Sequence, residues 1–209
     1  MTDNEPVSAI VDAEKEAAKM LFGLAIAISA IPLLLRLPAK PFGIVIDIAE
    51  FGFSFLILVS VWFGYWNVMS VLPMEDRTIV GLNIGLLFLV SIEPYLFYLN
   101  ITFDLLSHEA LLNAASTGYA LDMTGLMMIL ALFTQQLAME ERGLVPKEAL
   151  ARYKRLRDVL VISAALFVIT VLPAFWTTKF LGQPMRFIFW FIPLIISSAR
   201  ILSERGFQE

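Results

Sequence analysis

Long apolar runs alternate with short polar segments along the whole chain. The first run, Met20 to Leu35, has about sixteen residues without a charge and lies between Lys19 and Arg36. As a helix it would be about 24 Å long, a little shorter than the hydrocarbon core of a bilayer, which is about 30 Å thick. The stems of Lys19 and Arg36 can cover the difference. This pattern predicts a helix that spans a membrane.

Five further apolar runs extend this prediction to an all-α integral membrane protein with six transmembrane helices in a single domain, residues 1–209. The predicted helices cover about residues 20–36, 43–69, 78–100, 118–138, 159–176 and 187–201. The mildly amphipathic segment 101–117 is expected to lie along the surface or to cap the bundle. The segment 139–158 is a basic loop, and its part from Lys147 to Arg157 is expected to lead straight into the fifth helix.

Composition supports a membrane protein and excludes several other classes. The chain is 59% hydrophobic and 16% charged, against about 45–50% and about 25% in soluble domains. It has no cysteine, which excludes disulfides and thiolate metal sites. It contains no zinc-protease, nucleophile-elbow, phosphate-loop or dinucleotide motif. We therefore expect no enzyme, no cofactor, no metal site and no nucleic-acid partner.

The distribution of basic residues predicts the orientation. If the termini and the basic loop are inside, only four of the 15 lysines and arginines fall outside, namely Arg36, Lys40, Lys179 and Arg186. Cytoplasmic segments carry an excess of such residues, so both termini are predicted to be cytoplasmic. The first residues are acidic and polar, unlike the basic start of a cleavable signal. The first helix is therefore predicted to be an uncleaved signal anchor.

Three acidic residues lie a turn or more inside apolar runs. Placing a carboxylate there costs a few kcal/mol of free energy unless it faces water or has a polar partner. They are Asp47, Glu50 and Glu93, of which Asp47 and Glu50 share one helix face. They could form an acidic outer mouth that concentrates cations, or they could lie at water level and keep the surface wet. Three further acidic residues are expected at water level on the outer side: Asp104, Glu109 and Asp122.

Ser29 is the only hydroxyl in the first apolar run. It could bond back to a carbonyl one turn earlier, or it could offer an oxygen to a dehydrating ion if it faces a pore. Small residues in the same run permit close helix contact and favour a crowded axis over lipid. They are Gly23, Ala25, Ala27 and Ala30.

Several features from the second helix onward follow a familiar order. The second helix ends in a stretch rich in tryptophan and asparagine, 62–67 (WFGYWN). An Asp76-Arg77 step then leads to a Leu82-Asn83 pair. Pro94 comes near the end of the third helix, and a basic loop leads to two final apolar helices that each contain a proline, Pro173 and Pro193. In these features the chain resembles the lysosomal potassium channel family (transmembrane protein 175), in its single-repeat prokaryotic form.

The hallmark of that family lies in helix 1 and consists of an arginine, three residues, and Phe-Ser-Asp, followed by a stretch like Ala-Ile-Ala-Ile-Thr. Here residues 25–29 (AIAIS) are similar to the second part. Lys15 stands at the arginine position, and Lys19, Met20 and Leu21 replace Phe-Ser-Asp. The chain therefore departs from the family in the polar residues that hold its helices together around the pore.

The resemblance implies a homotetramer in a prokaryotic plasma membrane, with four copies of helix 1 around a central pore for potassium and other monovalent cations. The positions that match the apolar constriction are Ile26, Ala30 and Leu33, and Ser29 matches the polar position beside it. An apolar constriction gates by dewetting and selects weakly among cations. No TVGYG filter is present, so the resemblance implies a weakly selective potassium channel.

Two other functions stay open on the sequence. A small transporter could use Asp47, Glu50 or Glu93 as proton or cation sites. A non-conducting membrane scaffold could bind a partner through the basic loop 139–158.

Overall fold

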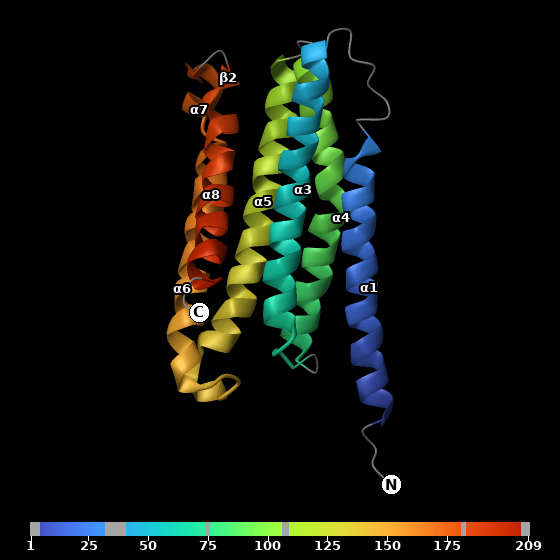
Figure 1. The fold of residues 1–209 in the computed structure, drawn as a ribbon, viewed down its shortest axis with the longest axis vertical. Helices are drawn as coiled ribbons and strands as arrows, with labels where there is room; N and C mark the ends of the chain where they lie inside the picture. The colour runs from blue at the N-terminus through green and yellow to red at the C-terminus, as the bar shows by residue number, and fades with distance from the viewer. Residues whose placement is uncertain (1–4, 32–40, 74–75, 106–108, 181–182, 206–209) are drawn as a thin grey trace.

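The computed structural model describes residues 5–31, 41–73, 76–105, 109–180 and 183–205, and these form a helical bundle (Figure 1). The α-helices of the described residues are α1 (Glu5–Ser29), α3 (Pro41–Met69), α4 (Arg77–Leu105), α5 (Glu109–Ala138), α6 (Lys147–Ile169), α7 (Ala174–Thr177) and α8 (Met185–Arg205). A 3-10 turn, η1 (Glu140–Arg142), follows α5. Two short antiparallel strands, β1 (Lys179–Phe180) and β2 (Gln183–Pro184), precede α8. The prediction of an all-α protein is confirmed.

The long helices run alternately up and down along the long axis of the molecule (Figure 1). Helix α5 is central, since it packs on α3, α4 and α6. Helix α1 lies at one edge and packs on α4 and α3, while α6 and α8 form the opposite edge.

Three described stretches are long and apolar enough to cross a membrane by length and composition. They are Phe51–Met69, Arg77–Asn100 and Glu109–Ala138. The chain thus has the helices of a membrane protein. The other predicted spans, and the side on which the termini lie, stay predictions.

Two predicted boundaries are wrong. The segment 101–117 is not a separate surface element, because α4 continues to Leu105 and α5 already begins at Glu109. Ser116 lies inside the bundle and donates a hydrogen bond to Asn100 across the two helices. The fifth predicted helix ends at Ile169 and not at Trp176. Pro173 has no backbone N–H to continue the helical ladder, so the chain turns and α7 begins after it.

Close packing of α4 on α5 holds the core together. A Cβ atom added at Gly125 would lie only 2.8 Å from Cδ1 of Leu89, so glycine permits this approach. Tyr119 contacts Phe97 on one side and Trp190 on the other, with ring centroids 5.8 and 4.8 Å apart. The core therefore joins α4, α5 and α8.

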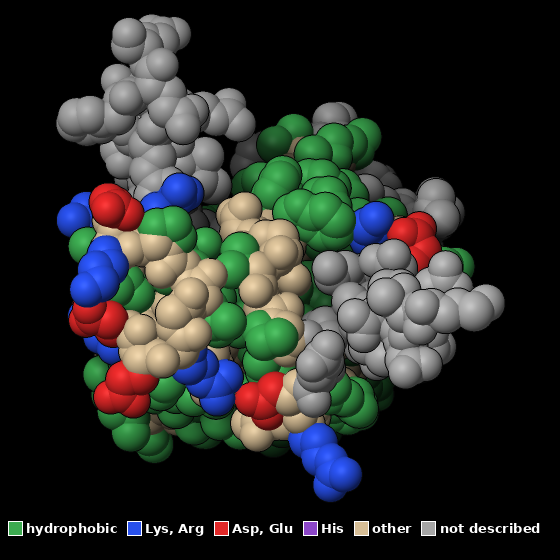
Figure 2. Space-filling model, turned by 90° about the horizontal axis from the view of Figure 1, so that it is seen from below, with side chains coloured by type: hydrophobic (Ala, Val, Ile, Leu, Met, Phe, Trp, Pro, Cys, Tyr) green, Lys and Arg blue, Asp and Glu red, His purple; other side chains and the backbone are tan. Residues whose placement is uncertain are grey.

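The charged residues of the described chain gather at one end. Figure 2 shows this end, with many of the basic and acidic side chains along one side, others elsewhere at the edge, and a middle of apolar side chains and other uncharged atoms. The basic loop supplies exposed Arg142, Lys147 and Lys154, and Nζ of Lys147 lies 3.2 Å from a carboxylate oxygen of Glu140. This is the end that the sequence predicts to be cytoplasmic.

Candidate functional site

Helix α1 has one face in the bundle and one face that the described part of the chain leaves uncovered. The buried positions, spaced three or four apart, are Ala18, Phe22, Ala25 and Ser29. The exposed positions are Met20, Gly23, Leu24, Ala27, Ile28 and Ile31. Met20 is 71% exposed and Leu24 is 57% exposed. An apolar strip of this kind needs lipid or another protein surface as its partner.

The predicted pore residues do not share one environment. Ser29 is only 2% exposed and points into the subunit, and its hydroxyl donates to the carbonyl of Ile26 at 2.7 Å. Ile26 is half-buried and packs against the core, and Ala30 is also half-buried. At about 100° per residue, Ile26 and Ala30 lie on the flank between the buried and the exposed faces. Leu33 lies outside the described residues.

Glu93 lies inside the subunit. It is completely buried, although α4 carries it within an apolar span. The hydroxyl of Ser54 on α3 donates to its carboxyl group, at 3.1 Å to Oε1. Within a single chain, Glu93 therefore meets a polar partner rather than water. The side chains of Asp47 and Glu50, the other two predicted mouth residues, lie outside what the structure describes.

Asp122 is not at water level, as the sequence had predicted, but buried within α5. It is 4% exposed, and among the described residues neither of its carboxyl oxygens has a hydrogen-bond donor. Asp122 and Tyr119 both lie close enough to Glu93 to act on its carboxyl group electrostatically. The structure thus places two carboxyl groups and a phenol together within two adjoining spans.

The sequence missed this cluster because it placed the start of the fourth helix at residue 118. A start at 118 puts Asp122 about one turn from the helix end, where a carboxylate reaches water. The observed start at Glu109 adds nine residues, or about 14 Å. The sequence does contain a pattern that could have revealed the cluster. Between residues 113 and 122, every third residue is polar: Asn113, Ser116, Tyr119 and Asp122.

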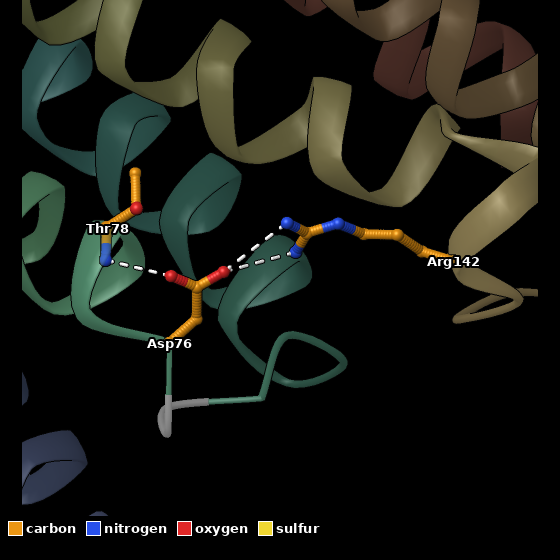
Figure 3. A network of polar contacts seen from close by, with 3 residues as sticks. All are labelled: Asp76, Thr78 and Arg142. Carbon is orange, nitrogen blue, oxygen red and sulfur yellow. Dashed lines mark hydrogen bonds and ion pairs between the residues drawn. The ribbon is translucent and has the colours of Figure 1, made fainter.

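Asp76 joins the start of α4 to the turn after α5 (Figure 3). Its carboxylate accepts a hydrogen bond from the backbone N–H of Thr78 at 2.8 Å, which caps the helix. The other oxygen accepts from the guanidinium of Arg142 at 3.3 and 3.4 Å. The Thr78 N–H, with a smaller contribution from Arg142, lowers the pKa of Asp76 from its ordinary value of 3.8. The Asp76-Arg77 step therefore has a structural role at the charged end.

A cavity of about 160 Å³ lies between α3, α5 and α6. Its lining is mostly apolar, with Asn67, Thr134, Ser163 and Arg152 as polar or charged members. No group of three or more His, Cys, Asp or Glu side chains in the described part of the chain is arranged to hold a metal ion.

No family model matches the chain, and no curated protein matches its sequence. Among solved structures, the chain is similar to the crystal structure of a lysosomal potassium-selective channel TMEM175 homolog from Chamaesiphon minutus. The two share 17% identity and superpose with a TM-score of 0.62, over 92% of this chain and 98% of that chain. The two chains share a fold. That homologue is a channel, and the resemblance noted in the sequence is supported at the level of the fold.

Proposed function

We propose that this chain is the subunit of a weakly selective potassium channel in a prokaryotic plasma membrane, with α1 lining the pore of a homotetramer. The observation that carries the proposal is the shared fold with the potassium-selective channel homologue over nearly the whole of both chains. Potassium and other monovalent cations would be the permeant ions.

The uncovered strip on α1 supports an oligomer. Gly23 and Ala27 within it are small and would let helices approach closely, while Leu24 and Ile31 supply apolar contact area. Ile26 and Ala30 lie on the flank of this strip, where neighbouring copies of α1 would meet around an axis. Four such flanks would form a narrow apolar constriction, which closes by dewetting.

The test is potassium-driven flux in liposomes that contain the purified full chain, with sodium measured beside it. Ile26→Asn is expected to raise flux several-fold, because an amide side chain holds water in an apolar constriction. Ile26→Leu keeps the volume and the apolar character and should leave flux unchanged. Leu24→Asn, on the uncovered strip, should change flux less than Ile26→Asn.

Two results would contradict the channel. One is the absence of flux of either ion from protein shown to be folded and oligomeric. The other is flux that no substitution at Ile26 or Ala30 alters, which would show that α1 does not line the pore.

A coupled transporter is the second candidate, and the burial of Glu93 inside an apolar span favours it. Buried carboxyl groups in membrane helices are common proton or cation sites. This function predicts saturable, pH-coupled uptake that Glu93→Gln abolishes. A channel would instead keep passive, non-saturating flux in the same variant, so the two outcomes separate the candidates.

A further inference from the structure

Helices α4 and α5 bury two acidic side chains between them, and a pore lined by α1 does not explain these residues. These helices run antiparallel, and contacts at glycines fix their register. The contacts are Leu96 with Gly118, Leu89 with Gly125 and Ile129 with Gly85. Between the first two, Glu93 is level with Asp122. The two carboxyl groups therefore face a common layer of the bundle, with Ser54 of α3 beside Glu93.

The described neighbours of these two carboxyl groups carry no positive charge that would neutralise them. The described neighbours of Glu93 are the hydroxyl of Ser54, which donates to it, and the side chains of Asp122 and Tyr119. Among the described residues, neither carboxyl oxygen of Asp122 has a hydrogen-bond partner. Two adjacent carboxylates without a cationic partner are strongly unfavourable away from water.

Charged groups on the other packed helices lie elsewhere. Arg186 of α8 donates to Asn113 at 2.9 Å, nine residues or about 14 Å along α5 from Asp122. On α1, the described charged pair Glu16 and Lys19 is exposed, with its atoms 3.1 Å apart. The charges of α6 belong to its first half, at the basic end, from Lys147 to Asp158. The side chains of Asp47 and Glu50 on α3 are not described.

We propose that Glu93 and Asp122 form a proton-binding site inside each subunit. A hydronium ion of the bulk solvent loses its proton, leaving water, and the proton forms an O–H bond on one of the two carboxylates and so removes one of the two negative charges. It also provides a hydrogen-bond donor, which the described neighbours of Asp122 do not supply. A proton needs no cavity, which suits a layer where α4 and α5 approach as closely as they do at Gly125.

A row of polar side chains, one every third residue, runs along α5 from the site towards the start of the helix. From Asp122 it passes Tyr119 and Ser116, both fully or nearly buried, and reaches Asn113 and its partner Arg186. Ser116 is also bonded to Asn100 of α4. This row leads away from the basic end of the molecule, so the proton would exchange with water on the side that the sequence predicts to be outer.

Infrared difference spectroscopy of the reconstituted full chain tests the site directly. A carboxylic acid has a carbonyl stretch that a carboxylate lacks, and the stretch shifts when the proton is exchanged for deuterium. The wild type is expected to show this band at a pH where exposed carboxyl groups are ionised. Glu93→Gln and Asp122→Asn are each expected to abolish or displace it. Glu109→Gln, which alters an exposed acid on the same helix, is the matched control and should leave the band unchanged.

The outcomes are decisive whether or not the chain conducts. A wild type without the band overturns the site, and this result needs no variant to fold. A band that persists in Glu93→Gln, Asp122→Asn and the double variant also overturns it. A band that disappears when potassium or sodium is added, with carboxylate bands taking its place, would show a cation site in place of the proton site and so overturn the proposal.

Discussion

Helices α1 and α5 are both apolar, but the subunit uses them in opposite ways. Helix α5 packs on three helices, α3, α4 and α6, and its polar side chains at Ser116 and Asp122 are buried. Helix α1 is covered on one side only, and Leu24 and Ile31 are exposed in a single chain. The central helix can therefore hold polar groups that are shielded from water, whereas the exposed side of the edge helix needs lipid or another protein surface against it. We therefore propose the proton site for the first and the pore for the second.

The sharpest test of this difference is the same substitution on each helix. Leu126→Ala in α5 removes a completely buried side chain and is expected to lower the free energy of unfolding by about 2–5 kcal/mol. Leu24→Ala in α1 should leave the stability of the isolated subunit nearly unchanged. Denaturant titration in detergent, with the oligomeric state measured by light scattering, separates the two effects. If the two variants lost equal amounts of unfolding free energy as monomers, the distinction would be contradicted. If Leu24→Ala alone dissociated the oligomer, the exposed strip of α1 would lie in a subunit interface.

A smaller contrast is expected between two serines. Ser116→Ala leaves the buried side-chain oxygen of Asn100 without its donor and should cost about 1–3 kcal/mol. Ser29→Ala removes a hydrogen bond within its own helix, to the carbonyl of Ile26, so the loss should be smaller, about 0.5–1 kcal/mol. Thermal unfolding of the two variants measures the difference. A loss at Ser29 as large as that at Ser116 would show that its hydroxyl has a partner beyond its own helix.

The smallest effect is expected at Asp76, at the charged end that both regions share. Its pKa is lowered in the folded chain, so its ionised form stabilises the fold above the ordinary value of 3.8, and this contribution is lost as the pH falls through the lowered pKa. Asp76→Asn keeps a good helix cap but loses the ion pair with Arg142. The variant should be slightly less stable than the wild type at neutral pH and equal to it in strong acid. A stability difference that stays constant from neutral to acid pH would exclude this ionisation as the cause.

The two regions also differ in how well the sequence predicts them. The span of α3 and most of α4 follow from apolar runs with clear polar boundaries. The start of α5 does not, because residues 109–117 are too polar to be recognised as membrane-embedded. Their polar groups become compatible with a span only when they pair across helices, as Ser116 does with Asn100. Such pairing depends on the register of α4 against α5, and no local pattern encodes that register.

The sequence by itself determined that this is an all-helical membrane protein, since long uncharged apolar runs have no other stable solution in a bilayer. It also indicated the fold of a known potassium channel family through loosely spaced motifs, and the shared fold supports that indication. Tertiary structure alone decided which side of each helix is covered. It turned Ser29 into the bundle, left Leu24 exposed and brought Glu93 level with Asp122. Hydropathy records how much apolar surface a helix has, and only packing against its neighbours determines where that surface points.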